Sequence, residues 1–222
     1  MNTKEPFVIT ISREVGSGGH TVGSILAHTL NVRYCDKQLL KALEKQFNLT
    51  PGAIERLKAE KKSWVTDFVN FITPMPMAEA LELDPKYAKE FRPDVTTDDI
   101  FKAEKEILQG FAQEGPCVIA GRSGFFVFKD HPNVLNVFIT ASLPHRVERI
   151  MTKQHLTEEE ALKVIKGIDK ARETYIQRFA GVSRYDVRNY HLALCADGHT
   201  EEQLAQQILS YIGWNTTSIR VG

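Results

Sequence analysis

The chain contains five apolar runs, each about the length of one β-strand. Four are continuous and the fifth is weaker, and they cover residues 7–12 (FVITIS), 117–121 (CVIAG), 134–141 (VLNVFITA), 191–196 (HLALCA) and 32–36 (VRYCD). Strands with one face in water alternate apolar and polar residues, whereas strands covered on both faces are apolar throughout. The runs therefore predict a parallel sheet that is buried on both faces.

Amphipathic helical patterns separate these runs. Residues Thr21–Leu30 carry apolar side chains at helical spacing, and Ile100–Phe111 carries a second stripe that Thr97 and Asp98 could cap. A further helix is predicted from Thr157, where the sequence TEEEALKVI has the form of a capping box. Strands that alternate with helices are joined by right-handed crossovers, so the pattern predicts an α/β fold.

Two polar segments interrupt the alternation. Residues 37–97 are helical and charged and then rich in proline, and residues 153–188 combine a long polar helix with a loop that contains arginines. With 222 residues, the chain has the length of one α/β domain with insertions. We expect a single domain in which both segments project from a core formed by residues 1–36, 98–152 and 189–222.

The balance of basic and acidic residues indicates which kinds of partner the protein is not expected to bind. Lys and Arg total 28, and Asp and Glu also total 28. A balanced chain has no overall field that attracts polymeric nucleic acid or an anionic membrane, so neither is expected as the main partner. Nothing in the pattern specifies an oligomeric state.

The cysteines and the N-terminal segment indicate a cytoplasmic protein. Cys35, Cys117 and Cys195 are far apart and have neither zinc-ligand nor redox spacing, so we expect reduced and mostly buried thiols. The N-terminal segment MNTKEPFVITIS is too short and too soon interrupted for a signal peptide, and no run reaches the length of a membrane span.

A glycine-rich segment, ISREVGSGGHTVG, follows the first predicted strand and leads into a helix. A standard phosphate-binding loop, G-x-x-x-x-G-K-[ST], has this strand–loop–helix context. Its glycines let backbone N–H groups approach an anion at the helix N-terminus. The letters depart from that pattern, because Arg13 replaces the first glycine and Gly19 replaces the lysine. The segment alone fits either a phosphate loop or a simple glycine-rich turn.

A second group of residues favours the phosphate loop. Gly121 and Arg122 directly follow a predicted strand, and Arg146 and Arg149 lie three residues apart on the helix after the next strand. The carboxyl ends of parallel strands line the crevice in which α/β sheets bind ligands. An arginine there can hold a phosphate through two hydrogen bonds.

These motifs resemble the nucleoside monophosphate kinases, and cytidylate kinase most closely. The segment GSGGHTVGSILAHTLNVRYCD is similar to that family's G-S-G-K-G-T-V-A run and the Y-L-D that follows it. The segment GRSGFFVFKDHPNVLNVFITASLPHRVERIM is similar to its G-R-D-x-G stretch, and DVRNYHLALCADG to its closing lid arginine and last strand. The likeness is closer still to a divergent cytidylate kinase-like family that begins I-S-R-x-x-G-S-G-G and also lacks the loop lysine.

The resemblance implies a fold, a reaction and a set of site residues. It implies a three-layer P-loop NTPase fold with a five-stranded parallel sheet, in which 37–97 binds the acceptor and 153–188 is a lid. ATP would donate a phosphoryl group to a nucleoside monophosphate, with CMP or dCMP as the first candidate, and Mg²⁺ would be held mainly by ATP phosphates and water rather than by a protein metal site. The residues implied for ATP phosphates are Gly16, Ser17, Gly18, Gly19, His20 and Thr21, those for the acceptor are Asp36, Arg122, Ser123 and Arg146, and the lid arginines for catalysis are Arg184 and Arg188.

Several of these residues also have ordinary structural explanations. Asp36 could cap the following helix, and Arg122 could form a surface salt bridge. Arg146 could belong to a solvated helix face, and His20 could be an exposed cap residue. Lys170 and Arg172, beside the lid arginines, fit a solvated charged helix equally well.

Departures from the family pattern put two steps in question, namely recognition of the acceptor and transfer of the phosphoryl group. Ser123 stands where the family has an acceptor-reading aspartate, and Ala42 stands where cytidylate kinases have an arginine, with Lys41 beside it. Losing a preorganised group such as the loop lysine costs roughly 10²–10³ in rate by analogy with oxyanion donors. A kinase therefore needs another cation, for which Arg13 and His20 are the candidates. The alternatives are a nucleotide-binding protein with weak or no catalysis, and a kinase of another small metabolite.

Overall fold

The computed structural model describes residues 1–35, 37–47, 95–121 and 123–213. The chain forms two compact units. The first unit contains Met1–Cys35, Gln109–His145 and Asp186–Gly222, and the second contains Asp36–Leu108 and Arg146–Tyr185. All strands of the described chain belong to the first unit.

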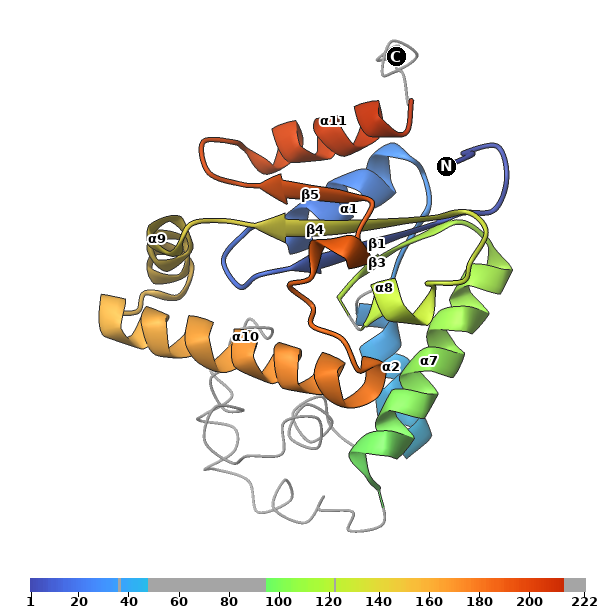
Figure 1. Ribbon diagram of the computed structural model, residues 1–222, viewed down its shortest axis with the longest axis horizontal. Coiled ribbons are helices and arrows are strands. Elements are labelled where there is room, and N and C mark those ends of the chain that lie inside the picture. Colours follow the sequence, from blue (N-terminus) through green and yellow to red (C-terminus); the bar gives the residue numbers. More distant parts are fainter. Residues whose placement is uncertain (36, 48–94, 122, 214–222) are drawn as a thin grey trace. The chain divides into compact units, whose positions relative to one another are not determined.

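A five-stranded parallel sheet forms the centre of the first unit (Figure 1). Its strands are β1 (Val8–Arg13), β2 (Arg33–Cys35), β3 (Cys117–Ala120), β4 (Val134–Thr140) and β5 (Leu192–Cys195). Their order is β2-β3-β1-β4-β5, and every neighbouring pair is parallel. The predicted α/β fold with a parallel sheet is confirmed. The apolar run of the central strand β1 is buried from Phe7 to Ser12.

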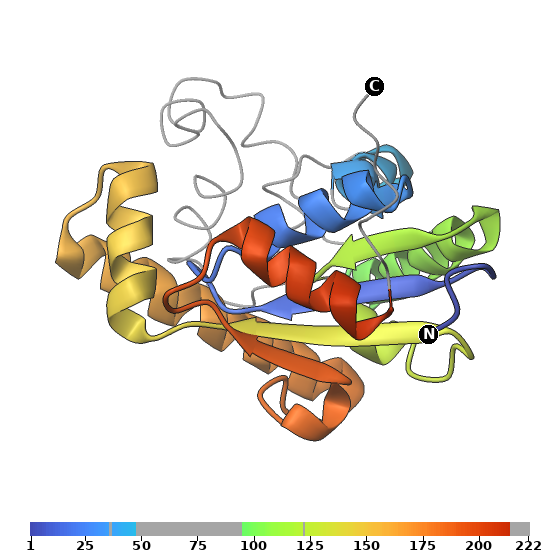
Figure 2. The same cartoon turned by 90° about the horizontal axis from the view of Figure 1, so that it is seen from above.

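Helices cover both faces of this sheet (Figures 1 and 2). Helices α1 (Gly19–Thr29) and α11 (Glu201–Tyr211) pack on one face, where Ile9, Leu26 and Ile208 belong to a continuous apolar core. The short helix α8 (Gly124–Val127) lies against the other face, because Gly124 contacts the side chain of Thr10. On that face the Thr10 hydroxyl donates to Oδ1 of Asn136 at 2.7 Å, which links β1 to β4 inside the core.

The parallel register brings the carboxyl ends of the strands to one edge of the sheet. Ile11 is level with Ala120 of β3, and Arg13 is level with Ile139 of β4. The loops that leave β1, β3 and β4 therefore start side by side, at the edge where such sheets bind ligands. This edge positions the candidate site.

The second unit is helical in its described part. It contains α2 (Lys37–Phe47), most of α7 (Thr97–Glu114), most of α9 (Leu143–Gln154) and α10 (Glu158–Ala180). Tyr175 of α10 donates its hydroxyl to Glu104 of α7 at 2.8 Å, and Phe101 stacks on Phe179 with ring centroids 4.3 Å apart. The predicted capping box at Thr157 is present. Within the described residues, no helix combines the length and the apolarity that crossing a bilayer requires.

Two local predictions need correction. The cap of α7 is Thr96, one residue before the predicted Thr97, because the Asp99 N–H donates to the Thr96 hydroxyl and the Asp99 carboxylate accepts the Thr96 N–H. Strand β5 is an edge strand in which exposed and half-buried residues alternate, so Cys195 is exposed rather than buried. A continuous apolar run cannot distinguish an edge strand from a central one.

The other two thiols are buried together. Cys35 on β2 and Cys117 on β3 are free and buried, and their thiols share a hydrogen bond. That bond and burial raise the pKa of the Cys117 thiol, so it stays protonated. We expect a disulfide reagent such as Ellman's reagent to modify one thiol rapidly in the native protein and three after denaturation. Rapid reaction of two or more native thiols would contradict this packing.

Candidate functional site

The loop between β1 and α1 turns sharply at two glycines. Gly16 and Gly18 have φ angles of 84° and 79°, in the left-handed region that favours glycine. Between them, the hydroxyl and the backbone N–H of Ser17 both donate to the carbonyl oxygen of Glu14, at 2.9 and 3.3 Å. The loop therefore ends at the first turn of α1, where unpaired N–H groups and the helix dipole favour an anion.

Glu14 attaches the start of this loop to β4. Its N–H donates to the carbonyl oxygen of Ile139 at 3.1 Å. Its carboxylate accepts hydrogen bonds from the Thr140 hydroxyl and, at 3.4 Å, from the Ala141 N–H. Glu14 is not among the site residues that the sequence predicts. The available signal was a carboxylate directly after a central strand, at the edge where strand ends meet.

Arg13 is the last residue of β1 and its side chain runs between two glycines. A Cβ atom added at Gly19 would lie 2.6 Å from Cβ and 3.0 Å from Cγ of Arg13. A Cβ added at Gly121, just after β3, would overlap Nη1 of Arg13 and lie 3.2 Å from its Cζ. The half-buried side chain thus starts beside the first residue of α1 and ends with its guanidinium against the loop after β3.

His20 points toward β2. Its ring is exposed and meets the Tyr34 ring edge-on, with centroids 5.6 Å apart. The Tyr34 hydroxyl donates to the carbonyl oxygen of His20 at 2.9 Å. Of the two candidate replacements for the loop lysine, Arg13 therefore has its cation at the ends of β1 and β3, whereas His20 has its ring on Tyr34.

The loop after β3 is strained and contains an unsatisfied hydroxyl. Gly121 and Ser123 have φ angles of 75° and 56°, and the second value is unusual for a residue with a side chain. Ser123 is 7% exposed, and among the described residues its hydroxyl has no hydrogen-bond partner. Arg122, between them, and Asp36, after β2, lie outside the described residues.

Two predicted site arginines meet in the second unit. Arg146 of α9 donates to Oδ2 of Asp169 on α10, and Arg184 has Nη1 3.4 Å from Oδ1 of the same carboxylate. The three residues are only 6%, 7% and 4% exposed, for Arg146, Asp169 and Arg184 respectively. The Arg184 N–H also donates to Glu173 at 3.0 Å, so the loop after α10 is held against the helix. Arg146 does not lie on a solvated helix face.

Arg188 has a different environment. It lies in a 3₁₀ turn, Val187–Asn189, and its side chain is 87% exposed. Its guanidinium donates to Asp186 from Nε at 2.8 Å and from Nη2 at 2.6 Å. The structure thus brings Arg13, the glycine loop and Ser123 to one edge of the sheet. It joins Arg146 and Arg184 through Asp169 in the second unit, and it pairs Arg188 with its neighbour Asp186.

The described residues contain no group of three or more His, Cys, Asp or Glu side chains that could hold a metal ion. Two described acidic side chains near the strand ends, Glu14 and Asp197, have protein partners. Glu14 accepts from Thr140, and Asp197, after β5, accepts the Ser142 N–H at 3.0 Å. This N–H lowers the pKa of the Asp197 carboxyl.

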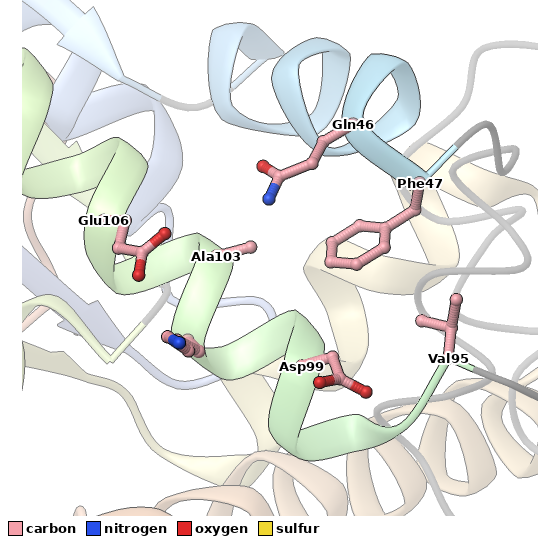
Figure 3. Close-up of a pocket in the computed structure, with 7 residues that line it drawn as sticks. Gln46, Phe47, Val95, Asp99, Ala103 and Glu106 are labelled. Atoms are coloured by element: carbon pink, nitrogen blue, oxygen red, sulfur yellow. The ribbon is translucent and has the colours of Figure 1, made fainter.

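The second unit also has a pocket of about 410 Å³ between α2 and α7 (Figure 3). Its described lining is mainly polar and comprises Gln46, Phe47, Val95, Asp99, Lys102, Ala103 and Glu106. None of the described site candidates is among these lining residues. The pocket belongs to the segment that leads from β2 to β3.

Comparison with known proteins identifies the family. The sequence model of the cytidylate kinase-like family matches residues 8–197, which include every residue of the site predicted above. The chain belongs to this family. Two curated relatives are cytidylate kinases, from Sulfurisphaera tokodaii (22% identical, covering 93% of this chain and 96% of the relative) and from Sulfolobus acidocaldarius (24% identical, 92% and 93%).

Solved structures confirm the fold. An uncharacterized protein from Eubacterium ventriosum matches with a TM-score of 0.65 and 20% identity, over 94% of this chain and 99% of that chain. Shikimate kinase from Bacteroides thetaiotaomicron matches with a TM-score of 0.51 and 15% identity, over 93% and 98%. The parallel sheet of this cytidylate kinase-like protein is thus the sheet of the P-loop kinases. Family membership supports a phosphotransferase that uses ATP and acts on a nucleotide or another small metabolite.

Proposed function

We propose that the protein transfers the γ-phosphoryl group of ATP to a nucleoside monophosphate, with CMP or dCMP as the first candidate. The observation that carries this proposal is the loop at the end of the central strand, where left-handed Gly16 and Gly18 lead into α1. Family membership and the two cytidylate kinase relatives support the kind of reaction and the kind of acceptor.

On the donor side, the backbone of residues 16–21 would hold the ATP phosphates. The residues present fit this task, because both sharp turns have glycine and the loop ends at a helix N-terminus. Mg²⁺ would be bound mainly by phosphate oxygens and water, as this ion prefers. Of the described acidic side chains at this edge, Glu14 and Asp197 already have protein partners. When bound, Mg²⁺ would neutralise negative charge on the phosphates.

On the acceptor side, we assign Asp36, Arg122, Ser123 and Arg146. Ser123 has the most direct support, because a buried hydroxyl without a partner and a strained backbone are features that cluster at functional sites. The segment 37–97 would complete the acceptor site and 153–188 would act as a lid on a single kinase domain. Arg146, which is held on Asp169, would support the site from α9.

The reaction would need no covalent enzyme intermediate. An acceptor phosphate oxygen forms a bond to the γ-phosphorus of ATP while the bond from that phosphorus to the β–γ bridging oxygen breaks, which leaves ADP. The acceptor oxygen is already ionised at neutral pH, so no general base is required. The protein would contribute positioning and positive charge, and we assign that charge to Arg13, Arg184 and Arg188.

A panel of acceptors tests this function. Purified protein with ATP and Mg²⁺ should release ADP fastest with CMP or dCMP among the common nucleoside monophosphates, and shikimate and sugars serve as non-nucleotide acceptors. Turnover of a non-nucleotide alone would replace the acceptor assignment. Tight ATP binding by calorimetry without turnover of any acceptor would favour a nucleotide-binding protein, which the missing loop lysine also allows.

A further inference from the structure

Two of the residues that depart from the standard phosphate loop, Arg13 and Gly19, touch each other. Position 13 has arginine where the loop normally has its first glycine, and position 19 has glycine where the loop normally has lysine. They are six residues apart in the chain, at opposite ends of the loop. In the structure, the Arg13 side chain begins where a side chain on residue 19 would begin.

Because of this contact, arginine at position 13 and lysine at position 19 exclude each other. A Cβ at position 19 would be 2.6 Å from Cβ of Arg13. Non-bonded carbon atoms prefer about 3.5–4.0 Å, and a Cβ atom cannot move without its backbone. A lysine at 19 therefore cannot coexist with Arg13 in this arrangement, and Arg13 occupies the space that the lysine stem would need.

A third position completes the arrangement. The Arg13 guanidinium lies against Gly121, where a Cβ would overlap Nη1. The Gly121 N–H donates to the carbonyl oxygen of Ile11 at 2.9 Å, so the backbone at 121 is fixed to β1. The Arg13 side chain thus requires glycine at two positions, at 19 beside its Cβ and at 121 beside its guanidinium. The guanidinium is held at the ends of β1 and β3, between the glycine loop and the loop of Ser123.

We propose that Arg13 and Gly19 are one exchange, in which an arginine from the strand before the loop takes over the phosphate-stabilising role of the missing loop lysine. This proposal rests on the proposed function, since it names the cation that acts on the transferring phosphoryl group. A guanidinium suits the role because its planar fork can contact two phosphate oxygens at once. Gly19 is then a steric requirement of Arg13 and not a sign of lost catalysis.

Reciprocal substitution provides the test. We expect Arg13→Ala to lower kcat by about 10²–10³, the loss typical of one preorganised charge-stabilising group. Gly19→Lys alone should lose a comparable factor, because its Cβ does not fit beside Cβ of Arg13 and the loop backbone would have to shift. The double variant Arg13→Gly/Gly19→Lys restores the first glycine and the lysine of a standard loop. Its kcat should exceed that of either single variant by at least tenfold, which is about 1.4 kcal/mol of transition-state stabilisation.

A matched control removes a different arginine from the same sheet. Arg33 starts β2 and pairs with Glu114 at 2.6 Å, at the opposite end of the strands from the site. Arg33→Ala should leave kcat within about threefold of the wild type. Arg13→Lys should keep ATP affinity better than Arg13→Ala, since it keeps the charge without the fork. Thermal melting of each variant separates lost chemistry from lost folding.

The outcomes distinguish the exchange from the function it rests on. If the wild type turns over an acceptor and the kcat of Arg13→Ala is within threefold of the wild-type value, Arg13 does not have the proposed role. A folded double variant no more active than either single variant overturns the exchange. If the double variant does not fold, Arg13→Ala and Arg13→Lys decide the role. If the wild type turns over no acceptor, the function fails, and an unchanged dissociation constant for ATP in Arg13→Ala then also overturns the exchange.

Discussion

Replacing Asp169 by asparagine is expected to lower the free energy of unfolding by about 3–5 kcal/mol, because removing one partner of a buried ion pair leaves charge without compensation. Asp169 accepts from Arg146 and has Nη1 of Arg184 at 3.4 Å, and all three side chains are buried. A third guanidinium, that of Arg172, lies 3.9 Å from the same carboxylate. Urea denaturation followed by circular dichroism measures the change.

An exposed pair in the same unit is the control for Asp169. Asp98 accepts from Arg178 at 2.6 Å, and the two side chains are 64% and 40% exposed. Exposed ion pairs contribute about 0–1 kcal/mol, so Asp98→Asn should change the free energy of unfolding by no more than that. Equal small effects of Asp98→Asn and Asp169→Asn would show that Asp169 is not the centre of a buried cluster.

Replacing Gly121 by alanine is expected to lower kcat by about 10², because the added methyl group displaces the Arg13 guanidinium. The Cβ would overlap Nη1, which is the flexible end of that side chain, so the arginine moves instead of the backbone. The loss of stability should therefore stay near the cost of a left-handed alanine, about 1–2 kcal/mol. Initial-rate kinetics with the best acceptor and thermal melting measure the two effects.

Gly213 offers a matched control for Gly121. Its φ is 70°, close to the 75° of Gly121, and a Cβ there would meet nothing within 4 Å. Gly213→Ala should therefore lose a similar amount of stability and keep its activity. If Gly121→Ala keeps full kcat, or if Gly213→Ala loses as much, the placement of the Arg13 guanidinium has no catalytic consequence.

The fold was predictable because its signals are local. Each apolar run and each helical stripe can be recognised without knowing its neighbours, and the capping box at Thr157 forms within one helical turn. The errors were also local in origin. Thr96 and Thr97 are adjacent and both suit a helix cap, and the run at 191–196 does not reveal that β5 has a neighbour on only one side.

The site was predictable only in part, because several of its contacts join distant segments. The glycine loop could be recognised from its own letters and its flanking elements. The contact of Arg13 with Gly121 and the attachment of Glu14 to Thr140 each span more than 100 residues, and only the register of the sheet creates them. The pairing of Arg146 with Arg184 through Asp169 likewise depends on how α9 and α10 pack, which no short pattern specifies.

Transfer of label from [γ-³²P]ATP tests the central claim most directly. Folded wild-type protein, Mg²⁺ and CMP are incubated with the labelled ATP, and the nucleotides are separated by thin-layer chromatography. We expect label to appear in CDP, at a rate at least 10² times higher for the wild type than for Arg13→Ala. Absence of labelled nucleoside diphosphate with CMP, dCMP and every other nucleoside monophosphate would contradict the account.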